Sequence, residues 1–562
     1  MFARTKKSGR HEYLQIVHND RVDGQVRQRV IGTLGRLDRL RESGDLGRLL
    51  SSLGRYEERV AVLGAHERGE WPEALARSIG PDLVFGRLWE ELGIGAVLRT
   101  RLERRRFEFD VERAVYLTVL HRLFDPGSDR ACEVWRHGYR IPGTEALGLH
   151  HLYRAMAWLG AVLPKGEQAG AIPFSTRTTK DALEEALFAR SRDLFSELEL
   201  VFFDTTSLYF EGAGGESLGQ FGHSRDHRPD RRQMVVGAVL DGEGRPVCSE
   251  LWPGNTTDVT TLLPVVDRLR ERFGVGELTV VADRGMVSRA TVRALESEGR
   301  GVHYILGTRM RTVNEVRQEV LSRAGRYREV RGLREAKKDP APLKVKEVWV
   351  GERRYIVCLN EEEAAAEAKA REAILAALEE QLRHGDKSLV GNKGYRRYLK
   401  ASSQGRFEID EGKVKEEARY DGKWVLTTDL DMDAAEVALK YKELWRVESL
   451  FRSIKSVLET RPVYHQSDAA IRGHVFCSFL ALVLLSELER RLADRGWKPE
   501  WKRLRNDLDR LQEIYVETSQ DAFFLRTRPE GDAGKAVQAA GVALGPTVRF
   551  LRPVDAKAWT RP

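Results

Sequence analysis

Three carboxylates occupy positions that apolar patterning does not require. Asp204 ends the run VFFD, Asp283 ends the run VVAD, and Glu448 lies within YKELWRVESLFRSIKS, residues 441–456. Carboxylate oxygens suit hard divalent cations, and three that converge can hold two ions. Two such ions can activate an attacking oxygen and stabilise a leaving oxygen at phosphorus. Each aspartate alone could instead cap the turn after its strand, so the trio, and not either aspartate, indicates phosphoryl-transfer chemistry.

Residues 441–456 have the spacing of an amphipathic helix. On ideal geometry Tyr441, Trp445, Glu448, Arg452 and Lys455 fall within roughly 100° of one another. A face that only feeds the core would not carry these charges, and a purely solvated ion-pair stripe would rarely carry the rings. A face that binds metal and DNA uses all of them, because carboxylates hold metal, cations hold phosphate and rings stack on bases.

A basic loop and a tryptophan are further candidates for DNA contact. The loop GHSRDHRPDRRQ, residues 222–233, carries Arg225, Arg228 and Arg232, which we expect to contact phosphates unless they are merely solvated. Asp226 in the same loop is either a fourth acidic group or the partner of a neighbouring arginine. Trp252 precedes a Pro-Gly pair and is either a core residue or a base-stacking one.

These residues need a sheet to position them. Strands are predicted within residues 199–212, 233–253, 277–283 and 301–309, and a helix is predicted to follow Asp258, which is a suitable N-cap. Strands mixed with helices in this order predict a mixed sheet with helices on its faces. Residues 311–430 show short strand signals around an Ala/Glu-rich helix and are predicted to form an insertion.

The two ends of the chain differ from this middle part. Residues 11–33 predict a hairpin around Asp23-Gly24, and residues 1–55 hold twelve Lys/Arg against six Asp/Glu. Residues 78–195 have helical spacing and include a cationic cluster, which is either a DNA contact or a solvated face. Residues 501–521 predict one more amphipathic helix.

Composition excludes several classes of protein. The net charge of +8 is a weak indication of a polyanionic partner. The four cysteines form no CxxC pair, so neither a zinc knuckle nor a disulfide framework is expected. The N-terminus lacks the apolar region of a signal peptide. Residues 475–491 are expected to form a buried helix and not a membrane span.

The motifs together resemble the DDE-type transposases of bacterial insertion sequences. The resemblance is to the branch with an insertion domain and a late Y-x2-R-x3-E-x6-K helix, matched here by Tyr441, Glu448 and Lys455. FFDTTSLYFEG, VVADRGM, GHSRDHRPDRRQMVVG, ELWPGNTTD and the N-terminal EYLQIVHNDRVDGQVRQRVIGTLGRL also resemble this family. The sequence departs from the motif at Leu444, where the family has arginine. We hypothesise that Arg452, on the same predicted face, supplies that phosphate contact.

The resemblance implies an α/β, RNase H-like mixed sheet with flanking helices. Asp204 would lie on its first strand, Asp283 after its fourth, and Glu448 on a late helix, together binding two Mg²⁺ or Mn²⁺ ions. The implied reaction is hydrolysis at the transposon ends, followed by attack of the 3′-OH on target DNA. Tyr441 and Lys455 would position phosphates, and a homodimer would hold paired terminal inverted repeats in the bacterial cytoplasm, associated with the nucleoid.

The predicted domain order follows from the residue patterns and the family resemblance together. The predicted domains are a basic DNA-binding region (1–60), a helical DNA-binding or dimerisation region (61–196), two parts of the catalytic domain (197–310 and 431–500), the insertion domain (311–430) and a helical tail (501–562). Two alternatives stay open: a catalytically inactive, repressor-like DNA-binding protein, and a nuclease of the same fold. The presence of all three acids favours the transposase.

Overall fold

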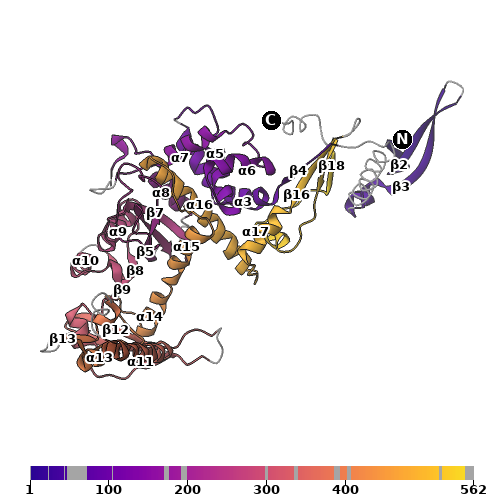
Figure 1. Cartoon of the computed structure of the whole chain (residues 1–562). Coiled ribbons are helices and arrows are strands. Elements are labelled where there is room, and N and C mark those ends of the chain that lie inside the picture. Colours follow the sequence, from indigo (N-terminus) through magenta and orange to yellow (C-terminus); the bar gives the residue numbers. More distant parts are fainter. Residues whose placement is uncertain are drawn as a thin grey trace. The chain divides into compact units, whose positions relative to one another are not determined.

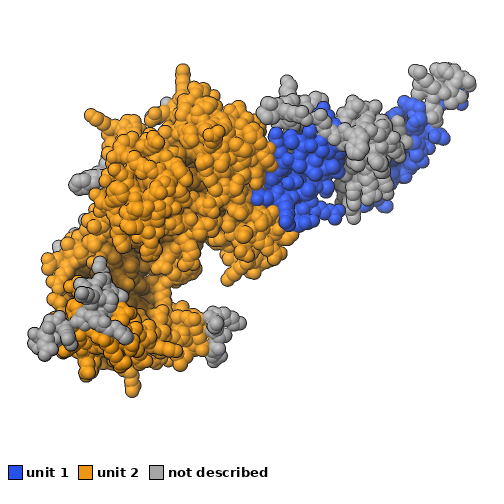
Figure 2. All heavy atoms as spheres, in the orientation of Figure 1, with its two compact units in different colours: residues 1–78, 509–530, 544–562 blue, residues 79–508, 531–543 orange. Residues whose placement is uncertain are grey.

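The chain forms two compact units (Figures 1 and 2). Unit 1 contains residues 1–78, 509–530 and 544–562, and unit 2 contains residues 79–508 and 531–543. Both ends of the sequence therefore contribute to unit 1. The computed structural model describes residues 2–22, 25–43, 45–46, 73–103, 105–169, 176–191, 199–297, 301–334, 339–384, 393–401, 407–517 and 522–550.

Unit 1 contains two small antiparallel sheets. The first has the order β1-β2-β3 and is followed by a short helix; its elements are β1 (Phe2–Ser8), β2 (His11–Val22), β3 (Gln25–Arg36) and α1 (Leu37–Glu42). The hairpin predicted for residues 11–33 is confirmed, because Val22 pairs with Gln25. Its Asp23-Gly24 turn lies outside the described residues, and β1 is an additional strand.

The second sheet of unit 1 joins distant segments in the order β18-β17-β16-β4. Its strands are β4 (Glu73–Ser78), β16 (Gln512–Glu517), β17 (Ala522–Arg526) and β18 (Val548–Phe550). The tail predicted as helical, residues 501–562, thus contains three strands besides the helices α17 (Trp501–Asp509) and α18 (Ala533–Ala539). These strands are only three to six residues long, and β16 pairs with a strand from the other end of the sequence.

A nine-stranded mixed sheet dominates unit 2, with the order β10-β11-β12-β15-β9-β8-β5-β6-β7. β5 pairs antiparallel with β6 and parallel with β8, and β8 pairs parallel with β9. The five strands on this side are β5 (Leu200–Tyr209), β6 (Gln233–Asp241), β7 (Pro246–Pro253), β8 (Leu278–Ala282) and β9 (Val302–Thr308). The prediction of a mixed α/β sheet with helices is confirmed.

Helices bury the apolar strands of this sheet. α9 (Leu262–Glu271) and α10 (Arg289–Leu295) share one hydrophobic core with Val201 and Phe203 of β5. α14 (Ala434–Lys442) contacts β8 and β9, α15 (Trp445–Ser456) contacts β5 and β6, and α16 (Asp468–Ala493) contacts β7. Near-continuous apolar sequences such as QMVVGAVL in β6 are typical of strands covered on both faces.

α16 is long and apolar enough to cross a membrane by length and composition alone. In the fold, 72% of its most apolar window is buried inside the protein. Its apolar residues pack against α5, α7 and α15, which confirms the buried helix predicted for residues 475–491.

Residues 311–430 extend the sheet. β10 (Arg328–Arg331), β11 (Leu343–Val350), β12 (Arg353–Leu359) and β15 (Lys423–Thr428) pair antiparallel, and β15 pairs with β9. Leu378 and Tyr398 belong to a separate small hydrophobic core in this region. The other elements of the region are η5 (Val316–Val320), α11 (Glu361–His384), α12 (Lys393–Arg396), β13 (Leu399–Ala401), β14 (Phe407–Ile409) and α13 (Glu411–Ala418). A separate insertion domain is not confirmed, and the domain boundaries stay predictions.

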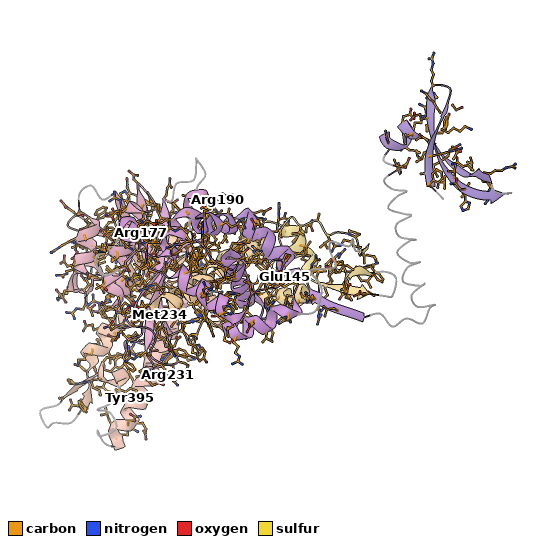
Figure 3. The ribbon with its side chains drawn as sticks, turned by 90° about the horizontal axis from the view of Figure 1, so that it is seen from above. Glu145, Arg177, Arg190, Arg231, Met234 and Tyr395 are labelled. Carbon is orange, nitrogen blue, oxygen red and sulfur yellow. The ribbon has the colours of Figure 1, made fainter. Side chains whose placement is uncertain are left out.

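The region before the sheet is helical, as expected. Its helices are α3 (Gly80–Glu91), α4 (Ile94–Leu102), α5 (Val111–Phe124), α6 (Asp129–Trp135), α7 (Leu149–Leu159) and α8 (Thr179–Ser191). Arg177 precedes α8 and Arg190 lies in its last turn (Figure 3). Buried ion pairs attach α8 to its neighbours: Lys180 Nζ lies 3.0 Å from Glu184 and donates to the Ser249 carbonyl on β7, while Arg268 of α9 contacts Glu184 at 2.6 Å.

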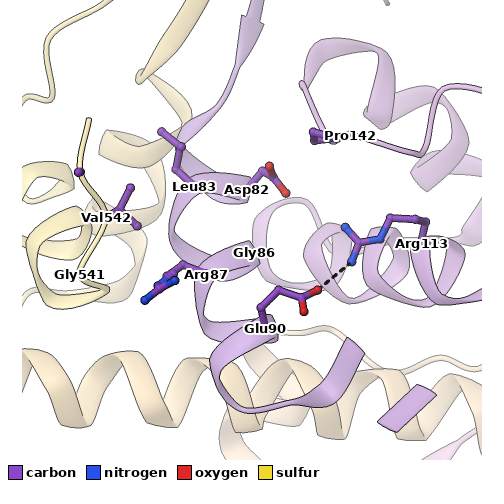
Figure 4. Close-up of a pocket in the computed structure, with 10 residues that line it drawn as sticks. Asp82, Leu83, Gly86, Arg87, Glu90, Arg113, Pro142, Gly541 and Val542 are labelled. Carbon is purple, nitrogen blue, oxygen red and sulfur yellow. Dashed lines mark ion pairs between the residues drawn. The ribbon is translucent and has the colours of Figure 1, made fainter. Parts of the chain in front are cut away.

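A pocket of about 530 Å³ lies beside α3 (Figure 4). Arg87 and Arg113 line it together with residues 541–543. Arg87 pairs with Glu91 at 2.6 Å, and Arg113 pairs with Glu112 at 2.6 Å and lies 4.0 Å from Glu90. Both arginines therefore already have carboxylate partners, and Asp82, which also lines the pocket, accepts a hydrogen bond from the Tyr116 hydroxyl at 2.9 Å.

Candidate active site

Two of the three predicted carboxylates lie side by side on neighbouring strands. Phe203 of β5 pairs with Ala282 of β8 in the parallel register, so the next residues, Asp204 and Asp283, are adjacent. Asp283 directly follows β8 and begins the turn η4 (Arg284–Met286). The first acid after each of the apolar runs VFF and VVA reaches the same place in the sheet, although Asp204 lies within β5, which continues to Tyr209, and Asp283 lies just after β8.

Asp204 is held in an unfavourable environment for a charge. The pKa of its carboxyl is raised from 3.8 to about 7: burial is the main cause and the nearby Asp283 and Asp258 carboxylates add to it, while the Arg225 guanidinium opposes the change. Arg225 Nη1 lies 3.8 Å from Asp204 Oδ1. Asp204 is therefore an acid whose negative charge would be relieved by a nearby cation.

Asp258 is a further acid at this place. It accepts a hydrogen bond from Thr205 Oγ1 at 2.9 Å and pairs with Arg225 Nη2 at 2.7 Å. The prediction that Asp258 caps the following helix is wrong, since α9 begins later, after Thr261, and has no side-chain cap. Asp258 instead begins the short helix η3 (Asp258–Thr260) and holds Arg225 between itself and Asp204.

Tyr441 supports the second acid. Its hydroxyl donates a hydrogen bond to Asp283 Oδ1 at 2.9 Å, and burial together with Asp283 raises the pKa of the phenol. Gly307 on β9 provides the space, because a Cβ there would lie 2.4 Å from the Tyr441 hydroxyl oxygen. Asp283 is thereby fixed by a residue from α14.

The helix carrying Glu448 is not the continuous one that the sequence predicted. α14 ends at Lys442, a turn follows at Glu443 and Leu444, and α15 begins at Trp445. The single helical face drawn through Tyr441 and Glu448 is therefore wrong. Leu444 is buried in the turn, which explains why it is not a phosphate-binding residue.

Glu448 itself lies in the first turn of α15, which contacts β5 and β6. Its side chain is exposed, and no hydrogen bond or ion pair joins it to another described residue. The structure therefore brings together Asp204, Asp283 and Tyr441 and leaves the third predicted ligand on a neighbouring, solvent-facing surface.

Some of the predicted phosphate-binding cations are bonded to other residues of the chain, and one, Arg452, is not. Lys455 pairs with Asp226 at 2.8 Å, and Arg228 pairs with Asp230 at 2.9 Å. Arg232 donates to the Gly219 carbonyl at 3.2 Å. Arg452 is exposed on α15, and no hydrogen bond or ion pair joins its side chain to a described residue. Arg231, in the same basic loop, precedes β6 close to Met234 (Figure 3).

The two predicted base-stacking tryptophans differ in exposure. Trp445 is 60% exposed at the start of α15. Trp252 packs against the core of the sheet, with its ring 6.5 Å from that of Phe203. The structure therefore favours the core interpretation for Trp252 and leaves Trp445 available for contact.

Whether these residues suit a divalent cation depends on their donor atoms. Asp204, Asp283 and Asp258 offer only oxygen donors, which fits Mg²⁺ or Mn²⁺, and the raised pKa of Asp204 marks a carboxylate that a cation would stabilise. Among the residues that the structure describes, no three His, Cys, Asp or Glu side chains are grouped closely enough to hold a metal ion. The aspartate pair fits the ion, while Glu448 is not yet part of a closed site.

Sequence comparison decides the family. The model of the transposase DDE domain matches residues 196–484, more than half of the chain. The chain belongs to the DDE transposase family. The matched segment contains Asp204, Asp283 and Glu448, and a second model, the N-terminal domain of IS1634 family transposases, matches residues 2–67. The suspected resemblance to an insertion-sequence transposase is confirmed.

Other relatives are distant. No curated protein is significantly similar to the transposase. Among solved structures, the cryo-EM structure of the piggyBac transposase synaptic complex with hairpin DNA covers 76% of this chain and 79% of its own, with 10% identity and a TM-score of 0.36. A similarity of this size does not establish a common fold.

Sequence reasoning missed Asp258 as a member of the acidic cluster. The segment ELWPGNTTD was noted, but its aspartate fitted the local pattern of a helix start. The available signal was that Asp258 ends a segment that resembles the family, so that it could either start a helix or lie with the other acids of the site. Asp226, in contrast, was expected to pair with a neighbouring arginine or to be a fourth acid, and its observed partners are Lys455 and Arg461.

Proposed function

We propose that this chain is an active transposase that binds the terminal inverted repeats of an insertion sequence. It cleaves the element ends by phosphodiester hydrolysis and joins the 3′-OH ends to target DNA. The match of both family models supports this reaction class. The observation that carries the proposal is the β5–β8 register, which makes Asp204 and Asp283 neighbours.

The catalytic domain in this proposal is RNase H-like. The strand order β7-β6-β5-β8-β9 supports it, because three antiparallel strands are followed by two strands parallel to β5. The acids then lie on the central strand and on its parallel neighbour. We place residues 431–500, including α14, α15 and α16, in the same domain, since these helices contact the sheet.

Asp204, Asp283 and Glu448 would hold two Mg²⁺ or Mn²⁺ ions. When bound, such ions activate the attacking oxygen and stabilise the leaving oxygen at phosphorus. The chain's own residues prepare this site: Tyr441 orients Asp283 by a hydrogen bond, and Arg225 balances the charge of Asp204. Glu448 would complete the site from α15, the helix that contacts β5 and β6.

DNA is the proposed partner. The exposed Arg452, together with Lys455, Arg228 and Arg232, offers cations for phosphates, and the exposed Trp445 offers a ring for base stacking. The basic N-terminal region would recognise the terminal repeats. We propose that two copies act on paired ends, in the bacterial cytoplasm at the nucleoid.

Single substitutions test the catalytic assignment. Asp204→Asn, Asp283→Asn and Glu448→Gln each remove one charge. Glu443→Gln is the matched control, because Glu443 lies just before the same helix and, in the described part of the chain, its ion-pair partner is Arg446. Excision of the chain's own insertion sequence from a plasmid is measured with Mg²⁺, and DNA binding is measured by gel shift. Each variant should lose cleavage at least about 100-fold while still binding DNA. Cleavage at the wild-type rate by any of the three removes that residue from the triad.

A further inference from the structure

One buried carboxylate holds two cations at the edge of the proposed site. Lys455 Nζ and Arg461 Nη1 both contact Asp226 Oδ1, at 2.8 and 2.7 Å. The side chain of Asp226 is 5% exposed, against 15% for Lys455 and 26% for Arg461. The acid therefore lies beneath the two cations, and the cations face outward.

This arrangement leaves binding capacity for an anion. A single carboxylate for two cations leaves a surplus of one positive charge, and Asp226 engages only one of the three Lys455 donors and one of the five Arg461 donors. The two nitrogens are no more than 5.5 Å apart, because both contact the same oxygen at the distances given above. One phosphate group, with charge-assisted hydrogen bonds of about 2.8 Å, can bridge such a pair.

Asp226 also keeps the lysine charged. Burial lowers the pKa of Lys455, and the hydrogen bond that its ammonium donates to Asp226 opposes that change. The other carboxylate oxygen, Oδ2, is buried without a hydrogen-bond partner in the described part of the chain. The role that fits a buried acid with this geometry is to orient the two cations.

The segment that carries Arg461 is firmly anchored. Thr460 is fully buried; its hydroxyl contacts Ser478 at 3.0 Å, and its carbonyl contacts His474 at 3.1 Å. Val463 exchanges backbone hydrogen bonds with the end of β5, accepted by Tyr209 and donated by Glu211. The strand that carries the first catalytic acid therefore also fixes the position of Arg461.

Aromatic contact holds the guanidinium as well. The Cζ of Arg461 lies over the Tyr209 ring, 5.7 Å from its centroid. The Cζ of Arg228 lies 5.3 Å from the same centroid. Arg452, the residue hypothesised to replace the missing family arginine, has no such support, since its side chain makes no hydrogen bond, ion pair or ring contact with a described residue. A cation fixed in advance loses less conformational entropy on binding than a free one.

We infer that Arg461, held beside Lys455 by the positioning residue Asp226, supplies the second cation of a DNA-phosphate site. This inference rests on the proposed function and deepens it, because it assigns the phosphate contact that Leu444 cannot make. The ligand is a phosphodiester of the DNA strand next to Asp204.

Salt-dependent DNA binding tests the inference. The full-length protein is titrated with a fluorescein-labelled 30-base-pair duplex of random sequence in EDTA, at several KCl concentrations. Arg461→Gln should weaken binding about tenfold at low salt and reduce the slope of log K against log[KCl] by about one. Arg490→Gln is the matched control, because Arg490 is also held by carboxylates but lies on α16 near Glu243, at the other end of β6. It should change neither quantity.

A double-mutant cycle tests the positioning role of Asp226. If Asp226 orients Arg461, the effect of Arg461→Gln should fall from about tenfold in the wild type to less than about threefold in an Asp226→Asn background. Equal effects in both backgrounds overturn the positioning role. Asp226→Glu, which keeps the charge, should restore part of the Arg461 effect. Melting curves confirm that each variant is folded.

The outcomes separate the inference from the proposed function. If the wild-type protein binds DNA and Arg461→Gln has the same affinity and the same salt slope, Arg461 does not contact phosphate. The transposase proposal then stays intact. Failure of the wild-type protein to bind the duplex at any salt concentration overturns the DNA partner itself.

Discussion

Replacement of Asp204 by Asn should stabilise the metal-free protein, and the gain should depend on pH. Burial and two neighbouring carboxylates raise the pKa of Asp204 from 3.8 to about 7. The folded protein therefore holds the proton more tightly than the unfolded chain. Well below pH 3.8 both states are protonated and the substitution gains nothing. As pH rises towards 7, the unfolded chain releases its proton and the wild-type fold loses stability that the uncharged Asn retains.

The size of the effect follows from the pKa change. Each pKa unit corresponds to about 1.36 kcal/mol, so above pH 7 the full effect is about 4 kcal/mol. At pH 5 the unfolded chain is mostly charged while the folded protein still holds the proton, and the gain, which grows by about 1.36 kcal/mol for each pH unit above 3.8, should be about 1.6 kcal/mol. For a unit the size of unit 2, with an unfolding entropy of roughly 0.9 kcal/mol/K, the larger value is a rise in Tm of about 4 °C.

Thermal melts in EDTA at pH 5 and pH 8.5 measure this difference. Asp230→Asn is the control, because Asp230 is exposed and its pKa is lowered to about 2 by Arg228; removing its charge should give no gain at either pH. Mg²⁺ should raise the Tm of the wild type and reduce its difference from Asp204→Asn. A Tm difference that is the same at pH 5 and pH 8.5, or absent at both, refutes the reasoning about the Asp204 environment.

Three further substitutions test contacts around the sheet. Tyr441→Phe removes the hydrogen bond to Asp283 and should slow DNA cleavage roughly tenfold with an unchanged Tm, measured in the excision assay; an unchanged rate would show that the hydroxyl does not orient the acid. Gly307→Ala should cost about 1–3 kcal/mol in urea unfolding, because the new Cβ would meet the Tyr441 hydroxyl. The same variant combined with Tyr441→Phe should recover part of that loss. Lys180→Met removes one of two cations from a buried ion cluster and should cost about 3–5 kcal/mol, and a loss below 1 kcal/mol would contradict the importance of that cluster.

The sequence predicted the parts of the site that depend on local apolar patterns. The runs VFF and VVA indicated buried strands, and the acids that directly follow two such runs meet when the runs pair in parallel, although β5 continues beyond Asp204 to Tyr209. The register of Phe203 with Ala282 confirms that the first two acids are neighbours. The helix-rich segment before the sheet and the N-terminal hairpin could be predicted equally well, because each depends on the spacing of residue types within a few positions.

The break between α14 and α15 could not be seen in the same way. YKELWRVE contains neither Pro nor Gly, and each half keeps a helical period. The chain bends because Leu444 is buried and because Leu444 and Val447 donate to the carbonyl three residues back. Such tertiary packing has no signal in a helical wheel. The partners of Asp258 are also remote, since Thr205 and Arg225 precede it by 53 and 33 residues.

The pairing of β15 with β9 has a consequence for engineering. β9 ends at Thr308 and β15 spans Lys423–Thr428, yet Thr308 pairs with Val425 in adjacent strands. The chain thus returns beside the point where it left, and α14 follows directly from that return. A reporter domain placed at the exposed turn of Gly351 and Glu352, between β11 and β12, would lie within this excursion and would leave the pairing of β5, β8 and β9 unchanged. The transposase can therefore be given extra sequence there without altering the strands that position its acids.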